Sequence, residues 1–522
     1  MTGRPRRSRR VIARWARAGL WLMVFGAGWR GALAAELPTT TPLERAQYKR
    51  LSHAAEISAD LDALVAASKL ARKELLGTSV AQRPLEALVL STTEPGAAQA
   101  HPRVMLVGSQ HGAAEPAGGE AMLRLARQLL AGDLRALLDD IDVVLVPDAN
   151  PDGRDSGHRS NARGVNLNTD FVALSQPESQ ALIAALERYR PMAVLDVHES
   201  AILKRKTLAR EGYLTDFDAQ FEAANHPALP SALRDYGQQT VLPALIAAVR
   251  EAGLPAQRYI GEITSTRQSI TNGGLSLRNF RNRAGMSGAL SFLVETKLDS
   301  RDDPWPTYRN IEARVARSLA CQRAFLKRMH AEREQLQRLV TAARVAAQKE
   351  PLPLRAVYAL DHDHPQVDIA LRRLADRQLE TLRFPDHRRV ATSDVIAMPA
   401  TYVVSEPSDA LRAALERQGI RYERQSQAFE LPVVAERFAP SKHANGRARL
   451  LTSTDKFITT APGALLIDLV QRDGRLVPLL LDPRSTSSLF RLPEFAPMVA
   501  ADREFGVYRV HKGVMRGAPP LE

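Results

Sequence analysis

The sequence predicts an α/β protein, with a mixed, mostly parallel sheet flanked by helices and a smaller, strand-rich α+β region after it. Between residues 103 and 295, short runs of Val, Leu and Ile alternate with longer segments of helical periodicity. Beyond residue 351, short β-rich runs separated by turn residues replace that alternation. At 522 residues the chain is too long for one compact core, so we expect two folded parts.

Short apolar runs of the first part are typical of strands buried on both faces of a sheet. The runs are 104–107, 143–146, 194–197 and 289–294. Segments with helical spacing of apolar residues lie between or beside them, at 120–138, 177–189 and 231–252. Ligands of such sheets bind at the carboxyl ends of the strands, so functional residues are expected directly after each run.

The rest of the chain has a different pattern. A stretch rich in Arg, Gln and Glu predicts one or two amphipathic helices, and β-rich runs at 400–404, 465–470 and 476–481 surround a helix at 408–418. The sequence DHDHP, at 361–365, is interpreted as a polar turn rather than a metal site. The expected organisation is an export signal at 1–34, a catalytic domain at 35–303, a helical connector at 304–350 and an accessory domain at 351–522.

The first 34 residues have the pattern of an export signal. A basic stretch is followed by an apolar stretch too short to span a bilayer and by Ala-Leu-Ala, a cleavage site ending at Ala34. The sequence SRRVIAR, at 8–14, is similar to a twin-arginine signal. We therefore expect a periplasmic or secreted protein with no stable membrane span after cleavage. An ordinary secretory segment or a retained anchor is the alternative.

Charge and cysteine content exclude some classes of function. The net charge is +13, but eight of the arginines lie in the first 34 residues, which contain no acid. The remainder is only modestly basic, so no nucleic-acid partner is expected. Cys321 is the single cysteine, which excludes an intrachain disulfide and a cysteine-ligated metal; its helical surroundings predict a buried apolar role.

Polar residues follow the apolar runs where a metal site would lie. His111 and Glu115 come after the first run, His198 follows the third, and Glu295 ends the last. Imidazole and carboxylate are the ligands that zinc prefers when thiolate is absent. Two histidines and one glutamate would leave a fourth position for water, as a hydrolytic zinc site requires.

The order of these residues resembles that of the zinc metallocarboxypeptidases, in particular their bacterial branch. The resemblance covers about 104–296 and includes NPDG from Asn150 and GVNLN from Gly164. It implies one zinc ion per chain, held by His111, Glu115 and His198. It also implies that Arg159 polarises the scissile carbonyl and that Glu295 is the general base.

The chain departs from the family pattern in three places that bear on the site. His111 and Glu115 are separated by one residue more than in the family, and we expect the loop beside Gly112 to absorb it. Asn166 replaces an Asp that would accept a hydrogen bond from His111. Thr169 replaces an Arg that grips the terminal carboxylate of the substrate, although the neighbouring Asn168 is kept.

Substrate binding and function are therefore expected as follows. Asn168 and Arg278 are the candidate substrate-binding residues, with Arg281 and Arg283 as alternatives to Arg278 or as part of a solvated basic face. The predicted function is zinc-dependent hydrolysis of a peptide or amide bond, with a peptide, including a cell-wall peptide, as substrate. The alternatives are a zinc deacylase of small acylated amino acids and a catalytically impaired binding protein. Glu199 and His158 are left as either site neighbours or solvated residues.

Overall fold

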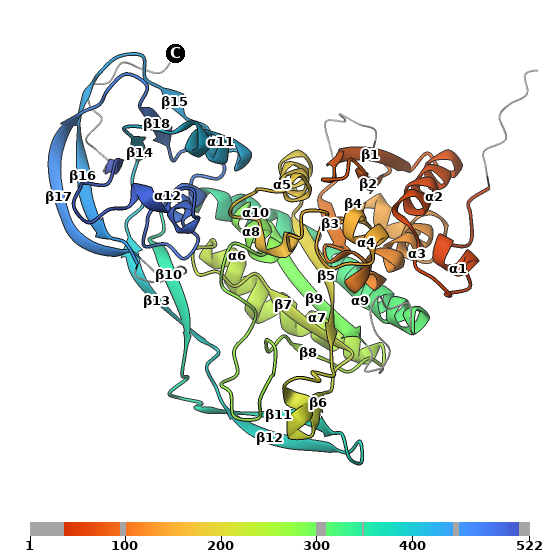
Figure 1. Cartoon of the computed structure of the whole chain (residues 1–522). Coiled ribbons are helices and arrows are strands. Elements are labelled where there is room, and N and C mark those ends of the chain that lie inside the picture. The colour runs from red at the N-terminus through yellow and green to blue at the C-terminus, as the bar shows by residue number, and fades with distance from the viewer. Residues whose placement is uncertain (1–35, 94–100, 299–309, 347–348, 442–447, 511–522) are drawn as a thin grey trace, which may run out of the picture.

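The computed structural model of the chain describes residues 36–93, 101–298, 310–346, 349–441 and 448–510 (Figure 1). The segment 1–34, for which an export signal is expected, lies outside the described residues. Within the described ranges, no helix is long and apolar enough to cross a membrane.

An eight-stranded mixed sheet forms the centre of the first part of the chain, in the order β1-β2-β4-β3-β5-β9-β7-β8. Its strands are β1 (Ala71–Thr78), β2 (Pro84–Leu90), β3 (Arg103–Gly108), β4 (Asp142–Val146), β5 (Ala193–Ala201), β7 (Ala219–Ala223), β8 (Ala256–Arg258) and β9 (Leu290–Leu298). The neighbours β4, β3, β5 and β9 are parallel to one another, and they are the four strands expected from the apolar runs. The predicted mixed, mostly parallel α/β fold is therefore confirmed.

Helices cover both faces of this sheet, as its alternating side chains require. On β3, Val104 and Leu106 belong to one core cluster, and Met105 and Val107 belong to another. The first cluster includes residues of α2 (Ala54–Ala67), α3 (Ala117–Ala131), α7 (Leu242–Glu251), α9 (Ile311–Ala331) and α10 (Arg333–Ala346). The second includes residues of α5 (Pro177–Tyr189) and α8 (Phe280–Met286). Short helices α1 (Pro42–Arg45), α4 (Pro151–Ser156) and α6 (Ser231–Tyr236) complete this part.

The C-terminal region is rich in strands, as expected. An antiparallel six-stranded sheet has the order β15-β18-β14-β19-β16-β17, with α11 (Asp409–Arg417) beside it. Its strands are β14 (Thr401–Val404), β15 (Glu423–Arg424), β16 (Glu430–Ala439), β17 (Arg449–Thr459), β18 (Leu465–Asp468) and β19 (Val507–Val510). Two antiparallel strand pairs precede it in the chain: β10 (Leu352–Ala359) with β13 (Arg389–Ile396), and, between them in sequence, β11 (Gln366–Arg373) with β12 (Leu379–Pro385).

One strand expectation in this region is wrong. Residues 476–481 form a buried helix, α12 (Leu476–Leu481), instead of a strand. The run is apolar at every position, so its periodicity cannot distinguish a strand from a helix buried on all sides. Pro478 lies in the first turn, where a missing N–H costs no helical hydrogen bond. The polar turn expected at 361–365 is confirmed, because Asp361 accepts hydrogen bonds from the backbone N–H groups of Asp363 and His364.

The two parts of the chain are interlocked (Figure 1). The short strand β6 (Tyr213–Thr215) pairs with β11, so a segment of the first part completes a sheet of the second. Leu229, Leu277 and Met286 of the first part lie in one hydrophobic cluster with residues of β14, α11 and α12. The boundary between the parts is thus a packed interface.

Helix α9 packs onto the central sheet. Phe325 makes an edge-to-face contact with Phe292 of β9, with 5.9 Å between the ring centroids. Cys321 is buried in the same cluster, as expected, and burial raises the pKa of its thiol to about 12. Arg314 of α9 donates hydrogen bonds to both carboxylate oxygens of Glu199, at 2.7 and 2.9 Å. A buried charge pair therefore ties this helix to β5.

Arg314→Ala is expected to lower the free energy of unfolding by about 3–5 kcal/mol, because it leaves the carboxylate of Glu199 buried without its partner. Urea unfolding followed by circular dichroism would measure the change. Arg338→Ala, an exposed arginine on α10, is the matched control and should change stability little. Equal stability of the two variants would contradict the importance of this buried pair.

Candidate metal centre

The parallel strands bring three predicted residues to one edge of the sheet. His111 follows β3, His198 lies in β5 and Glu295 lies in β9. His198 and Glu295 are direct partners in the β5–β9 register, so their side chains project from the same face. Two segments distant in sequence are thus placed side by side by backbone hydrogen bonding.

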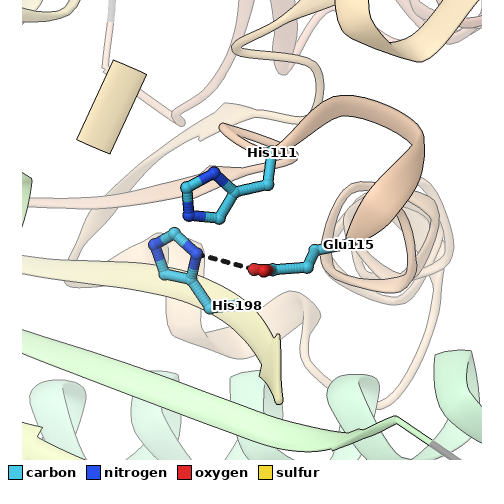
Figure 2. Close-up of side chains that lie close together, drawn as sticks. All are labelled: His111, Glu115 and His198. Atoms are coloured by element: carbon cyan, nitrogen blue, oxygen red, sulfur yellow. Dashed lines mark hydrogen bonds and ion pairs between the residues drawn. The ribbon is translucent and has the colours of Figure 1, made fainter. Parts of the chain in front are cut away.

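His111, Glu115 and His198 form one buried cluster (Figure 2). Each residue offers one ligand atom, and these atoms lie within 4.8 Å of one another. Nδ1 of His198 is 2.9 Å from Oε2 of Glu115, and the two imidazole rings have centroids 4.8 Å apart. Two nitrogen donors and one carboxylate therefore point into a common space.

The additional residue between His111 and Glu115 is accommodated by a tight turn. Residues 112–114 form a single 3₁₀ turn that begins after His111 and ends at Glu115. Gly112 has a φ of +50°, and an added Cβ would lie 2.5 Å from the backbone carbon of Gly153. Only glycine fits this close approach, so Gly112 permits the turn that brings both side chains into the cluster.

Asp196 and Gln110 support the cluster and are absent from the sequence-based prediction. Asp196 Oδ1 lies 2.9 Å from Nε2 of His198 and accepts a hydrogen bond from Gln110 Nε2 at 2.5 Å. Asp196 precedes His198 by two residues on the same strand, so both side chains project to one face. That spacing was visible in the sequence as D-V-H. A carboxylate on the second ring nitrogen orients a metal-binding histidine and raises its basicity.

Burial and neighbouring charges set the protonation of the cluster. Burial lowers the pKa of His111 to about 3, which keeps its imidazole neutral. Burial also acts to lower the pKa of His198, but Asp196 and Glu115 outweigh it and raise that pKa well above its usual value. Burial acts to raise the pKa of Glu115, yet His111, His198 and Arg159 hold it below its usual value. The carboxylate of Glu115 is therefore ionised.

Arg159 lies directly against the cluster. Its guanidinium forms an ion pair with Glu115, and Nη2 lies 2.9 Å from Nε2 of His111. The side chain is 50% exposed, so it lines the open side of the cluster. Asn150, the first residue of NPDG, caps α4 and donates hydrogen bonds to the carbonyls of Gln110 and Arg159. This asparagine joins the histidine loop to the arginine loop.

Glu295 is partly buried beside the cluster, and its Oε2 is shielded from solvent without a hydrogen-bond partner among the described residues. Burial, followed by the negative charge of Glu115, raises the pKa of Glu295 to about 8. An unpartnered buried carboxyl oxygen is costly and is found where a ligand or a reacting group completes its contacts. Glu295 therefore holds a proton more tightly than a free carboxyl group does.

The predicted substrate-binding residues lie at the edge of the site. Asn168 Nδ2 is 3.3 Å from Nε2 of His198, while its Oδ1 accepts a hydrogen bond from the backbone of Phe280. Thr169 is exposed, and Arg278 donates a hydrogen bond from Nε to its carbonyl at 3.1 Å. Arg278 is exposed, so its guanidinium is available at this edge.

The side chains of four other residues do not point into the cluster, although the backbone N–H of Glu199 donates to Oε2 of Glu115 at 3.2 Å. Arg281 is buried and donates to Asn225 and to the Gly274 carbonyl. Arg283 is buried beside Ser287, so neither arginine forms a solvated basic face. Glu199 projects to the opposite face of β5, where it accepts the first N–H of α3 and pairs with Arg314. Asn166 accepts the backbone N–H of Asn168 instead of contacting His111.

The donor set fits zinc. One neutral imidazole, one carboxylate and a second imidazole held by Asp196 match the ligand types of hydrolytic zinc sites. Nδ1 of His111 is buried with no hydrogen-bond partner among the described residues, as expected of an atom that would bind an ion. His111, Glu115 and His198 would hold the metal.

Asp196→Ala is expected to weaken zinc binding by about 10–100-fold, because His198 loses the carboxylate that orients its ring. Competitive titration of zinc against a chelator would measure the affinity. Asp361→Ala, in the exposed polar turn, is the control and should leave the affinity unchanged. Unchanged affinity in Asp196→Ala would show that Asp196 does not support the ligand.

Comparison with known proteins gives one family match within the first part of the chain and several relatives. Residues 57–193 match the family model described as zinc carboxypeptidase. "Probable carboxypeptidase 2" of Arthroderma benhamiae is 30% identical over 199 residues, which cover 37% of this chain and 38% of the relative. "Carboxypeptidase SOL1" of Arabidopsis thaliana is 31% identical over 151 residues, which cover 26% of this chain and 30% of the relative.

A solved structure, a metallo-carboxypeptidase from Burkholderia cenocepacia, is 25% identical with a TM-score of 0.40 and covers 53% of this chain and 69% of the other. At that score the likeness adds nothing to the sequence matches. The chain spans about two fifths of the length of the curated relatives it matches first. The matched residues 57–193, which contain His111, Glu115 and Arg159, are similar to the zinc carboxypeptidase family over that range.

Proposed function

We propose that the protein is an exported zinc-dependent peptidase that hydrolyses a peptide or amide bond. The observation that carries this proposal is the convergence of His111, Glu115 and His198 within 4.8 Å at the carboxyl edge of the sheet. The match of residues 57–193 to the zinc carboxypeptidase family supports the same reaction class. The ligand types favour a hydrolytic zinc site over an emptied one.

Each residue around the cluster has a role that its contacts support. Zinc, when bound, supplies a Lewis acid that polarises a carbonyl and acidifies water. Glu295 accepts the proton of the attacking water and later returns it to the leaving nitrogen. Arg159 donates hydrogen bonds to the carbonyl oxygen as that oxygen gains negative charge. Asn168 and Arg278 position the substrate at the outer edge.

The compartment and the substrate follow from the signal-like N-terminus. Its basic stretch, short apolar stretch and Ala-Leu-Ala sequence support export to the periplasm or beyond. In that compartment a peptide, including a cell-wall peptide, is the proposed substrate. Position 169 is a threonine, and a threonine cannot form a salt bridge with the free carboxylate at the end of a peptide. Cleavage next to a chain end therefore depends on other residues.

Elemental analysis of the mature protein is expected to find one zinc ion per chain. His198→Ala should lose the ion, because the substitution removes one of the three ligands. Circular dichroism would verify that the variant is folded. Retention of stoichiometric zinc by His198→Ala, or no zinc in the reconstituted wild type, would contradict the proposed site.

Glu295→Gln is expected to keep its zinc and to lose about 10²–10⁴-fold in turnover, because an amide cannot accept the proton. Hydrolysis of N-benzoylated dipeptides, together with metal analysis, would measure both effects. Glu494→Gln, an exposed residue of the C-terminal region, serves as the control. If Glu295→Gln turned over substrate at near the wild-type rate, the assignment of Glu295 as the base would be wrong. If the protein showed no turnover and the substitution left ligand binding unchanged, a non-catalytic binding protein would be favoured.

A further inference from the structure

The C-terminal region contacts a loop of the first part through the hydroxyl of Tyr358, on β10. This hydroxyl donates a hydrogen bond to the carbonyl of Gly273 at 2.6 Å and accepts one from Nδ2 of Asn225 at 3.0 Å. Gly273 and Asn225 both belong to the first part of the chain. The hydroxyl therefore acts as donor and as acceptor across the boundary between the two parts.

Strand β10 is anchored by its buried side chains. Leu352 and Leu354 lie in the hydrophobic cluster that the two parts share, and Tyr358 follows four residues later on the same face of the strand. The carbonyl of Leu354 also accepts a hydrogen bond from the N–H of Thr486 at 3.2 Å. The strand pairs with β13 from Leu352 to Ala359. The core of the C-terminal region thus determines where the Tyr358 hydroxyl lies.

Three buried side chains of the first part bind the same loop. Nδ2 of Asn225 donates to the carbonyl of Gly273 at 2.7 Å. Arg281 and Asn282 each donate to the carbonyl of Gly274 at 2.9 Å. Tyr358 therefore completes a set of hydrogen bonds that fixes the backbone at two successive glycines, and it is the member of the set that comes from the C-terminal region.

The beginning and the end of this loop, residues 273–280, are tied to each other. Nδ2 of Asn279 donates to the carbonyl of Ser276 at 2.8 Å and to that of Gly274 at 3.3 Å. Oδ1 of Asn279 accepts the N–H of Asn282 at 2.9 Å, which caps α8. A displacement at Gly273 is therefore transmitted to Phe280, the first residue of that helix.

The end of the loop contacts the edge of the metal cluster. The N–H of Phe280 donates to Oδ1 of Asn168 at 2.8 Å, and the N–H of Phe171 donates to the carbonyl of Arg278 at 3.3 Å. Because Oδ1 of Asn168 is used in this way, its Nδ2 lies toward His198, at 3.3 Å from Nε2. The orientation of the Asn168 amide therefore depends on the position of the loop.

The candidate metal ligands are held by other elements. The 3₁₀ turn at 112–114 places His111 and Glu115, while His198 lies in β5 with Asp196 beside its ring. The hydrogen bonds of the Tyr358 hydroxyl go to Gly273 and Asn225, and among the described residues none of them reaches a ligand. Loss of this hydroxyl should thus alter the substrate-binding edge and leave metal binding unchanged.

We propose, resting on the proposed function, that Tyr358 is a positioning residue for the substrate, and that it orients Asn168 through the loop at 273–280. A continuous series of hydrogen bonds runs from Tyr358 to Gly273, along the loop, and from Phe280 to Asn168. The C-terminal region thereby takes part in the reaction, because it holds the substrate-binding edge of the first part in place.

Tyr358→Phe in the zinc-loaded full chain removes the hydroxyl and keeps the ring. Gly273 retains its hydrogen bond from Asn225, so the variant should fold and bind zinc like the wild type. Its KM for an N-benzoylated dipeptide is expected to rise about 3–10-fold with kcat nearly unchanged, as for the loss of a contact that positions bound substrate. Steady-state kinetics, zinc titration and thermal unfolding would measure these effects. Tyr508→Phe, which loses a hydroxyl bonded to Glu504, is the matched control and should keep the wild-type KM.

A double-mutant cycle with Asn168→Ala tests whether Tyr358 acts through this amide. Once Asn168 is replaced, adding Tyr358→Phe should raise KM by less than about two-fold, because residues that act through one another are not additive. The proposal would be overturned by a wild-type KM in Tyr358→Phe, by equal increases in KM with and without Asn168→Ala, or by loss of zinc or of folding in Tyr358→Phe. Failure of the proposed function would appear separately, as absent zinc or absent turnover in the wild type.

Discussion

The parallel pairing of β5 with β9, and of β5 with β3, is the constraint on which the site depends. Parallel strands end at one edge, so residues distant in sequence share a small volume there. The register places His198 opposite Glu295, and the turn after β3 adds His111 and Glu115. A shift of one residue in this register would project His198 to the opposite face, and the cluster would be lost.

Successive side chains of β5 point to opposite faces of the sheet, and the charged residues on the two faces have different roles. Asp196 and His198 project to the face of the metal cluster, while Glu199 projects to the other face and binds Arg314 of α9. One face of β5 therefore carries a candidate metal ligand, and the other face carries a carboxylate that is already paired with an arginine. Removing either member of this pair would leave an uncompensated buried charge, so the end of β5 and α9 depend on each other.

Much of the fold and part of the site could be predicted from the sequence. The four central strands were visible because each contains a short, mostly apolar run that is followed by polar residues. Helix α12 was not, because an apolar run with no alternation fits a buried helix equally well. His111, Glu115 and His198 were found by residue type and order, and their proximity agrees with that prediction. Asp196 was missed although its two-residue spacing from His198 was visible, while the burial of Arg281 and Arg283 depends on tertiary contacts that sequence does not contain.

The pairing of β6 with β11 has a consequence for how the molecule can be divided. A fragment that ends before residue 350 would leave the edge of β6 without its partner and would expose Leu277 and Met286 to water. Its sheet and its metal ligands would all be present in the sequence of the fragment. The hydrophobic cluster beside them would still be incomplete, because residues of the C-terminal region form part of it.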